Sequence, residues 1–522
     1  MIYSAPEKDA EFLLFDVFDV EQIWSKIADF RDIDRSTIEA IIAEGSRLSA
    51  QTLFESFQES KHSGCDWNGG QVLAPKEFKN AFKELTSGGW LGLSGNPRFG
   101  GQGMPKMLGC LIEEMFWASN ASLYLYGTLT VGASLCIDSH GSEDQKKVYL
   151  EKLYSGQWTG AMALTESHAG TDLGIIKTKA EPDADGSYTL TGTKIFITSG
   201  EHDMAENIIH LVLAKLPDAP PGTKGISLFI VPKFLMDSNG DLSERNSWSS
   251  GSLEHKMGIT GSATSVINYD NARGFLLGEE NQGLNAMFTM MNYERLSVGL
   301  QGLGSGDLAY QQAAQYAKDR VQGRSPRGPQ NENGVADSLL VHPDVRRMLF
   351  TQRAYNEAGR AFGLFVGMQL DLANHADDPV AKQLVDLLTP VAKAFLSDKG
   401  FEGAVLAQQV FGGHGYIKEW GVEQIVRDAR IAQIYEGTNG IQAIDLVTRK
   451  LKISDGLAIK NFLDEIKETS KKCSEKNDND FIKIANNLNT AIAEVEICTE
   501  KLLEWTKENK LRSVLFSASD YL

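Results

Sequence analysis

The chain has 522 residues, of which 42% are hydrophobic and 23% charged, as is typical of a globular protein with several domains. Its formal net charge of −18 argues against sequence-independent nucleic-acid binding, which depends on Lys and Arg neutralising phosphates. No stretch approaches the roughly 18 uninterrupted apolar residues of a membrane span, so no stable membrane insertion is predicted.

The cysteines are scattered along the chain and include no CxxC pair. This spacing predicts neither a disulfide framework nor a metal site, and it favours the reducing cytoplasm as the location. The first residues contain no basic segment followed by an apolar run, so no signal peptide is predicted.

The first half of the chain divides into three predicted regions. Residues 1–35 form a mixed N-terminal extension. Residues 36–157 form a helical domain, with helices at Leu108–Ala118 and Leu123–Asp138 and a capping-box pattern from Ser142 to Gln145. In residues 158–282 the apolar runs are short, β-branched and bounded by turn residues such as Asp183–Gly186, which is typical of an antiparallel β domain.

The second half is predicted to be helical. Residues 283–450 form a four-helix bundle, and a more charged helical region follows at 451–522. That region ends on apolar residues without a cap, which predicts a truncated chain. The four long periodic stretches of the bundle are Leu284–Ala317, Val345–Ala376, Ala381–Lys399 and Phe401–Phe411.

The glycine-rich segment Gly89–Gly103 is interpreted as a loop between helices. A dinucleotide-binding fingerprint would need a strand before its glycines, and the segment that precedes Gly89 has a helical pattern.

The segment Gln433–Gln442 places a carboxylate, Glu436, between Tyr435 and Gly437, with apolar helical sequence on both sides. Burying a carboxylate costs free energy unless other groups compensate. The hypothesis that follows is that Glu436 acts as a base.

Three further segments could carry chemistry, although each has an ordinary structural explanation. Ala161–Asp172 leads a strand into a turn that could accept a polar cofactor edge, or it is simply strand, turn and strand. In Lys194–Gly200, Phe196 could stack on a planar ring and Thr198 could bond its rim, although an aromatic in a strand is more often core. Gln409–Tyr416 ends a helix in glycines, as a C-cap or as a close approach to a ligand.

These segments occur in one order with several others: Gly89–Gly103, GSEDQK from Gly141, the helix Met291–Leu296, Asp319-Arg320, and RDAR leading into IYEGT. In that order the chain resembles the acyl-CoA dehydrogenase family of flavoproteins over about residues 40–450. The fold that the resemblance implies is a helical domain, a β domain and a four-helix bundle. The long terminal parts resemble a subgroup of larger members, which includes 3-methylthiopropionyl-CoA dehydrogenases.

The resemblance implies FAD as the cofactor, held partly across a subunit interface, so a homodimer or homotetramer is expected. Many members have Trp where Phe196 stands, and an aromatic often stands where Gly323 does. The implied substrate contacts are Thr171, Asn292, Arg295, Tyr435 and Gly437. The implied FAD contacts are Met162, Leu164, Thr165, Thr171, Phe196, Thr198, Arg320, Gln322, Gln409, Gly413 and Thr438.

Glu436 matches the position of the family's catalytic base. Removal of the α-proton of a thioester needs a polarised carbonyl oxygen and a base whose pKa is raised towards neutrality in an apolar pocket. Some members carry their base at the position of Glu294 instead, and this chain has an acid at both positions. Glu436 is favoured because its motif is intact, and Glu294 is expected to be a structural glutamate or the ion-pair partner of Arg295.

The implied function is FAD-dependent α,β-dehydrogenation of an acyl-CoA to the trans-2-enoyl-CoA, with 3-methylthiopropionyl-CoA as a candidate substrate. Flavin N5 would take the β-hydride, and electron-transfer flavoprotein would take the electrons. One alternative is an acyl-CoA oxidase, which passes electrons to oxygen. Another is a non-catalytic acyl-CoA-binding protein on the same fold.

Overall fold

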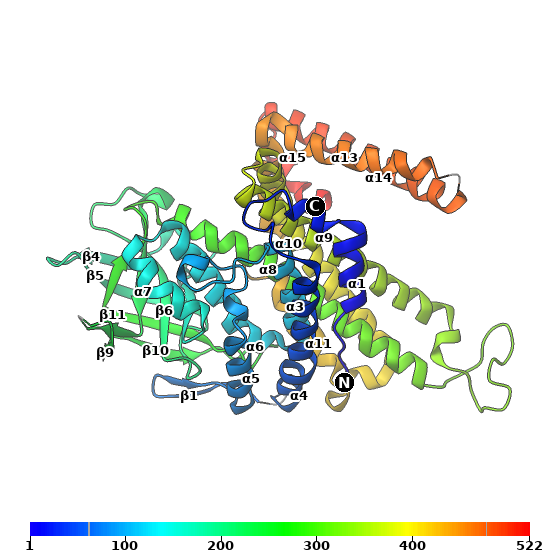
Figure 1. Ribbon diagram of the computed structural model, residues 1–522, viewed down its shortest axis with the longest axis horizontal. Coiled ribbons are helices and arrows are strands. Elements are labelled where there is room, and N and C mark those ends of the chain that lie inside the picture. The colour runs from blue at the N-terminus through cyan, green and yellow to red at the C-terminus, as the bar shows by residue number, and fades with distance from the viewer. Residues whose placement is uncertain (61–62, 238, 477) are drawn as a thin grey trace.

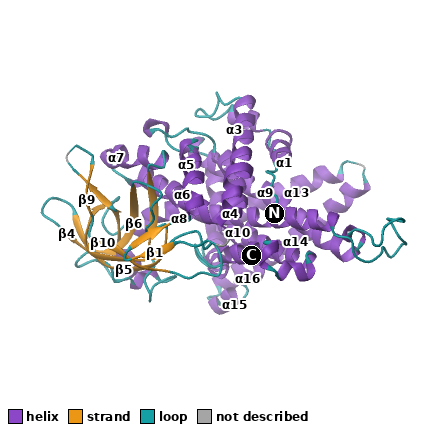
Figure 2. Cartoon of the chain, turned by 90° about the horizontal axis from the view of Figure 1, so that it is seen from below, coloured by secondary structure: helices purple, strands orange, loops and turns teal. Residues whose placement is uncertain are grey.

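A computed structural model describes residues 1–60, 63–237, 239–476 and 478–522. Figures 1 and 2 show the strands gathered at one end of the molecule and helices filling the rest. The predicted architecture, mainly helical with a central β region, is therefore observed. Within the four described ranges, no helix is long and apolar enough to cross a bilayer.

The N-terminal helical part is built around one long helix, α6 (Lys106–His140). The sequence predicts two helices here, and the structure joins them across a kink at Asn120, whose side chain accepts a hydrogen bond from the Leu123 N–H. The other helices of this part are α1 (Glu7–Glu11), α2 (Val20–Trp24), α3 (Arg35–Arg47), α4 (Phe54–Ser60), α5 (Lys76–Ser87) and α7 (Glu143–Tyr154).

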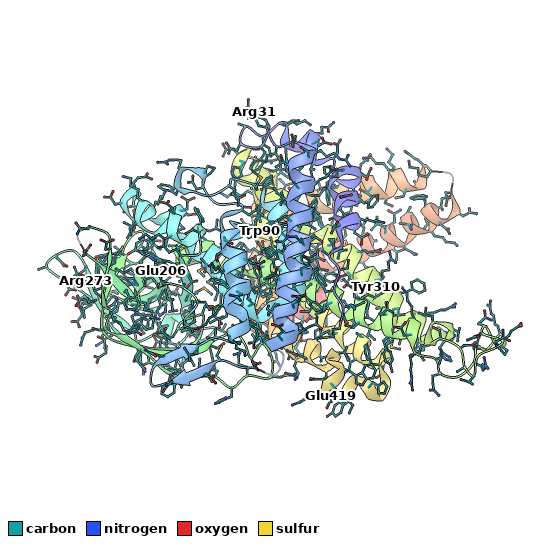
Figure 3. The ribbon with its side chains drawn as sticks, turned by 60° about the horizontal axis from the view of Figure 1, so that its bottom comes forward. Arg31, Trp90, Glu206, Arg273, Tyr310 and Glu419 are labelled. Atoms are coloured by element: carbon teal, nitrogen blue, oxygen red, sulfur yellow. The ribbon has the colours of Figure 1, made fainter. Side chains whose placement is uncertain are left out.

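Two local predictions for this part are confirmed. Helix α7 begins with the capping box, because Ser142 Oγ accepts from Gln145 N and Gln145 Oε1 accepts from Ser142 N. The Gly89–Gly103 segment is a loop between α5 and α6 that contains two short helical turns, Trp90–Gly92 and Pro97–Phe99. Trp90 lies near the middle of the molecule in Figure 3, with its ring edge-on to Phe116 at 5.5 Å.

The β region forms a seven-stranded sheet in the order β10-β11-β5-β4-β6-β3, with β7 pairing β11 and β6. Most pairs are antiparallel, as predicted, and the Asp183–Gly186 turn joins β4 to β5. The edge strand β3 instead runs parallel to β6, because the chain crosses over between them through β4 and β5. The strands of the sheet are β3 (Trp158–Ala163), β4 (Lys179–Pro182), β5 (Tyr188–Thr198), β6 (Asn207–Lys215), β7 (Ile226–Pro232), β10 (Trp248–Leu253) and β11 (Thr264–Leu276).

Two small hairpins flank this sheet. Strands β1 (Asp66–Asn68) and β2 (Gln71–Leu73) form one, and β8 (Phe234–Met236) and β9 (Leu242–Arg245) form the other.

The C-terminal bundle consists of α8 (Gly283–Asp319), α9 (Pro343–His375) and α10 (Pro379–Val410), with α6 packed on α8 and α9. The prediction that Ala381–Lys399 and Phe401–Phe411 are separate helices is wrong, because α10 is continuous through both. Gly400 does not end a helix: a Cβ there would lie 1.9 Å from Gly302 O, so the glycine allows α8 and α10 to touch. Two short helices, α11 (Val422–Ala429) and α12 (Asn439–Thr448), follow.

The last region folds as a helical hairpin that projects from the bundle in Figure 1. Ser470 Oγ donates to Ala485 O, and Lys467 pairs with Glu496, so α13 and α14 run antiparallel. Its helices are α13 (Leu457–Ser474), α14 (Asn479–Lys507), α15 (Leu511–Phe516) and α16 (Ala518–Tyr521).

A buried ion cluster joins α6, α8, α9 and the N-terminal segment. The Arg360 guanidinium is 1% exposed, and its Nη2 lies 2.6 Å from Glu114 and 3.5 Å from Asp307. Its Nη1 lies 3.3 Å from Asp9, which carries the N-terminal segment against the bundle. Desolvation makes such a cluster costly unless all its members are present.

Arg360→Met is therefore expected to destabilise the fold by about 3–5 kcal/mol, because it leaves two buried carboxylates without their cation. The matched control is Arg353→Met, on the same helix, whose exposed pair with Glu357 is worth about 0–1 kcal/mol. Chemical and thermal unfolding measure both variants. Equal stability losses would contradict this account of the cluster.

Candidate active site

The turn that carries Glu436 is held in an unfavourable backbone conformation. Glu436 has φ +55° and Gly437 has φ +80°, and a non-glycine residue rarely adopts the first. The Gln442 side chain, one turn into α12, donates to Glu436 O at 2.9 Å and to Gly437 O at 3.2 Å. A Cβ at Gly437 would lie 2.8 Å from Gln442 Nε2, so glycine is required beside this amide.

The flanking residues of the turn are also fixed. The Tyr435 hydroxyl donates to Gln301 Oε1 on α8. Thr438 is the N-cap of α12 and accepts from the Ile441 N–H at 3.3 Å. Asn439 Nδ2 donates to Asp398 Oδ1 at 2.7 Å, which ties the turn to α10.

The electrostatic surroundings suit Glu436 to proton transfer. Its carboxyl is half-buried, and desolvation raises its pKa to about 7, although the positive charges of Arg295 and Lys393 oppose the rise. A carboxyl with this pKa is partly ionised at neutral pH, as a general base must be.

Glu294 lies close enough for its charge to interact with that of Glu436, but its surroundings differ. It is 2% exposed, and its Oε1 has no hydrogen-bond partner in the described part of the chain. Burial, followed by the negative charges of Glu436 and Glu113, holds its pKa well above the usual range and so favours its protonated form.

The expected ion pair between Glu294 and Arg295 is absent among the described residues. The Arg295 guanidinium lies 3.3 Å from Asp445 on α12 instead. Successive residues of a helix point in different directions, and Glu294 points towards α6, where a Cβ on Gly132 would lie 2.7 Å from its Oε1.

The β residues that the sequence indicates lie together at one edge of the sheet. Phe196 is 58% exposed and has φ +61°, so it is not the core aromatic of an ordinary strand. Thr165 O accepts from the Ile195 N–H at 2.9 Å, which places the end of β3 beside β5. Met162, Leu164, Thr165 and Thr198 are half-buried, and Thr171 is exposed.

The chemistry of this edge fits the rim of a flavin. Thr198 lies opposite Thr264 in the pairing of β5 with β11. Thr264 lines an open cleft of about 480 Å³. Three hydroxyls near this pair, those of Ser199, Ser262 and Ser265, are buried and have no partner within the described ranges. The exposed Phe196 ring and the half-buried side chains of Thr165 and Thr198 are suited to a planar group with polar edges.

A second set of indicated residues lies elsewhere. Arg320 and Gln322 follow the end of α8, and Gln409 and Gly413 lie at the end of α10, all of them exposed. Tyr316 brings these ends together, because its ring stacks on Phe411 at 4.1 Å. The loop between α8 and α9 projects from the end of the molecule opposite the β region (Figures 1 and 2), so one chain does not unite both sets.

Two indicated substrate residues also sit on α8. Asn292 is exposed and accepts a hydrogen bond from Arg295 Nη1 at 3.4 Å. Arg295 is itself buried, and its charge reaches both Asp445 and Glu436.

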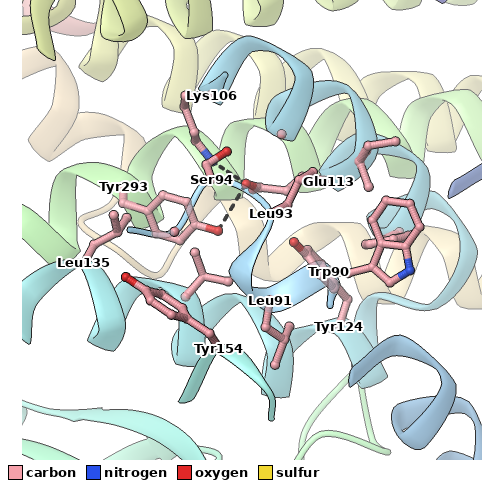
Figure 4. Close-up of a pocket in the computed structure, with 15 residues that line it drawn as sticks. Trp90, Leu91, Leu93, Ser94, Lys106, Glu113, Tyr124, Leu135, Tyr154 and Tyr293 are labelled. Atoms are coloured by element: carbon pink, nitrogen blue, oxygen red, sulfur yellow. Dashed lines mark hydrogen bonds and ion pairs between the residues drawn. The ribbon is translucent and has the colours of Figure 1, made fainter. Parts of the chain in front are cut away.

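A partly enclosed, mostly apolar cavity of about 50 Å³ lies between α6, α8 and the 89–103 loop (Figure 4). Tyr293, the neighbour of Glu294 on α8, lines it, as do Trp90 and Tyr124. Its polar side consists of Lys106 paired with Glu113, and the Tyr293 hydroxyl donates to Glu113 at 3.1 Å.

Sequence reasoning missed the residues that hold the Glu436 turn, namely Lys393, Asp398, Gln442 and Gln301. One available signal was Lys393 itself, a lone cation in the apolar run Pro390–Leu396. The other three have no distinguishing pattern in the sequence.

The fold combines an N-terminal helical part, a β region and a C-terminal helical bundle, and comparisons with known proteins show which class of protein has this arrangement. Models of the acyl-CoA dehydrogenase N-terminal, middle and C-terminal domains match residues 66–157, 161–272 and 281–451. The 3-methylmercaptopropionyl-CoA dehydrogenase of Ruegeria pomeroyi is 41% identical over 91% of this chain and 81% of its own length. The broad-specificity linear acyl-CoA dehydrogenase FadE5 of Mycobacterium tuberculosis is 36% identical over 89% and 78%, respectively.

A solved structure of butyryl-CoA dehydrogenase from Megasphaera elsdenii superposes with a TM-score of 0.65 at 27% identity, covering 80% of this chain and 98% of that one. The chain belongs to the acyl-CoA dehydrogenase family of flavoprotein oxidoreductases. Its activity is accordingly acyl-CoA dehydrogenation.

The protonated state of Glu294 is testable by infrared spectroscopy at about pH 8.5, where carboxyls with pKa values near 7 are ionised. The difference spectrum of wild type minus Glu294→Gln is expected to show the carbonyl stretch of one protonated carboxyl, because the Glu294 carboxyl is buried and its Oε1 has no hydrogen-bond partner among the described residues. The control is Glu436→Gln, whose difference spectrum should show an ionised carboxylate. A carboxylate signal from Glu294 would contradict the account.

Proposed function

We propose that this enzyme uses FAD to convert an acyl-CoA thioester into its trans-2-enoyl-CoA, with Glu436 as the catalytic base. The observation that carries the proposal is a half-buried carboxyl in a strained turn whose pKa is raised to about 7. A strained, partly desolvated carboxyl lowers the stability of the fold. Such carboxyls are therefore concentrated at functional sites.

The turn also supplies a donor for the thioester. The Glu436 N–H donates no hydrogen bond to any residue that the structure describes. We propose that it binds the thioester carbonyl oxygen and so stabilises the negative charge that develops as the α-proton leaves. The proton then moves to the Glu436 carboxylate, and Gly437 leaves room for the substrate beside it.

FAD is proposed to lie against the edge of the sheet, with Phe196 stacked on the flavin, Thr198 at its rim, and Met162, Leu164 and Thr165 along its other edge. Thr171 would contact its pyrophosphate, and Thr438 would contact it from the α12 cap. When bound, FAD supplies the acceptor for the β-hydride.

The site is proposed to be completed by a second copy of the chain. Arg320 and Gln322 lie in the loop between α8 and α9, which projects from the end of the molecule opposite the β region, and Gln409 and Gly413 lie at the end of α10; all four residues are exposed. These side chains could instead contact the FAD bound to a neighbouring copy of the chain, which supports a homodimer or homotetramer.

The acyl group is proposed to be short. The cavity in Figure 4 lies beside Tyr293, next to Glu294 on α8, and its volume of about 50 Å³ has room for only a few heavy atoms. Its aromatic walls suit an apolar or thioether end, so 3-methylthiopropionyl-CoA is a candidate, in keeping with the relative from Ruegeria pomeroyi. Thr171, Asn292, Arg295, Tyr435 and Gly437 are the proposed substrate contacts.

We further propose electron-transfer flavoprotein as the electron acceptor and the cytoplasm as the location. The five cysteines are all free, as is usual in a reducing compartment. Rapid reoxidation by air with product bound would instead indicate an acyl-CoA oxidase, and purified protein without flavin absorbance would indicate a non-catalytic binding protein.

The assignment of the base is tested by Glu436→Gln and Glu294→Gln. Glu436→Gln is expected to slow anaerobic reduction of the flavin by substrate about 10²- to 10⁴-fold, because general-base catalysis is lost. Glu294→Gln removes a carboxyl that is already neutral, so reduction should stay within about tenfold of wild type. Stopped-flow absorbance measures both rates, and the reverse pattern would make Glu294 the base.

The size of the acyl site is tested with a panel of acyl-CoA substrates read by flavin bleaching. Butyryl-CoA and 3-methylthiopropionyl-CoA are expected to react with a higher kcat/KM than palmitoyl-CoA, because the small cavity beside Tyr293 would exclude long chains. Equal or better reaction of palmitoyl-CoA would contradict the proposed limit on chain length.

A further inference from the structure

Lys393 is a buried cation that the family assignment does not explain. It is 0% exposed, in the middle of α10, and burying an ammonium group is costly unless other groups compensate. Its Nζ donates to Gly437 O at 2.8 Å and to Asn439 Oδ1 at 2.7 Å. Neither acceptor carries a charge, and no ion pair of Lys393 occurs within the described ranges.

The charged groups around Lys393 influence its pKa. Glu436 and Asp398 favour its charged form, whereas burial and the charge of Arg295 oppose it, and its pKa falls to about 8. Arg295 is already paired with Asp445, which also binds Arg449 at 2.7 Å.

Two other acids, Asp398 and Glu294, lie in the surroundings of Lys393 and Glu436. Asp398 accepts hydrogen bonds from Asn439 and from Gln433, at 2.7 and 2.6 Å. Burial, and next the charge of Glu436, raise the pKa of Glu294 on α8 and favour its neutral form. The Lys393 ammonium therefore has no acidic partner of its own among the described residues and, together with Arg295, favours the ionised form of Glu436.

We propose that Lys393 is a positioning residue for the base, which fixes the turn 436–439 through Gly437 and Asn439 and holds the Glu436 carboxylate in its ionised form. This inference rests on the proposed role of Glu436. A neutral donor already reaches Gly437 O, since Gln442 donates to it at 3.2 Å, so anchoring that carbonyl does not by itself require a charge.

The test is the pH dependence of flavin reduction in holoenzyme carrying Lys393→Met or Lys393→Gln. The Gln variant keeps a hydrogen-bond donor while removing the charge. The apparent pKa of the base is expected to rise by about one unit in both variants, which is about a fivefold slower reduction at pH 7 and near-complete recovery at about pH 9. The control is Lys399→Met, which removes a half-buried lysine of the same helix that pairs with Glu402, and it should match wild type.

The outcomes separate this inference from the assignment of the base. Wild type should show an ionisation near pH 7 in the rate of flavin reduction, and Glu436→Gln should lack it. If that ionisation persists in Glu436→Gln, the assignment of Glu436 as the base is wrong. If it belongs to Glu436 but the Lys393 variants lose rate equally at every pH, the lysine does not act on ionisation and the inference is overturned. Loss of folding in both neutral variants would also overturn it, because the lysine would then be needed for folding.

Discussion

The proposed site depends on one electrostatic constraint, which is that the Glu436 carboxyl must be desolvated enough to be basic and still be ionised. Burial alone would raise its pKa beyond use, and the charges of Arg295 and Lys393 oppose that rise, which leaves the pKa at about 7. The pKa of Glu294, on α8, is held well above its usual range, because burial and the negative charges of Glu436 and Glu113 outweigh the opposing charge of Lys106. Two acids in one region thereby have different surroundings and different tendencies to ionise.

The rest of the bundle serves to hold these charges in place. Helices α8 and α10 touch at Gly302 and Gly400, and this close contact brings Arg295 and Lys393 onto the same turn from two sides. Helix α12 adds Gln442, which fixes the carbonyls of Glu436 and Gly437. The strained backbone at Glu436 is thus maintained by packing and hydrogen bonds from three helices.

Much of the fold was accessible from the sequence, because it rests on local patterns. Helical periodicity, the capping box at Ser142 and the turn at Asp183–Gly186 are set by neighbouring residues, and all appear in the structure. Gly400 was misleading because its role is a contact with α8, which no local pattern encodes. The parallel pairing of β3 with β6 is likewise decided by the crossover and not by the strand sequences.

For the site, the sequence indicated the acid and the exposed ring but not the charges that tune them. The position of Glu294 follows from the direction of one side chain on α8, and spacing alone suggested a pairing with Arg295 that the helix geometry does not allow. Lys393 appears in the sequence as one cation in an apolar run, and only the folded turn shows which carbonyl it reaches.

The central claim is that Glu436 removes the α-proton, and α-hydrogen exchange tests it most directly. The holoenzyme is incubated in D₂O with an acyl-CoA analogue whose β-carbon is replaced by a heteroatom, so that no hydride can leave. Wild type and Glu294→Gln are predicted to incorporate deuterium at the α-carbon, as measured by mass spectrometry, and Glu436→Gln is predicted not to. Exchange that persists in Glu436→Gln and is lost in Glu294→Gln would contradict the account.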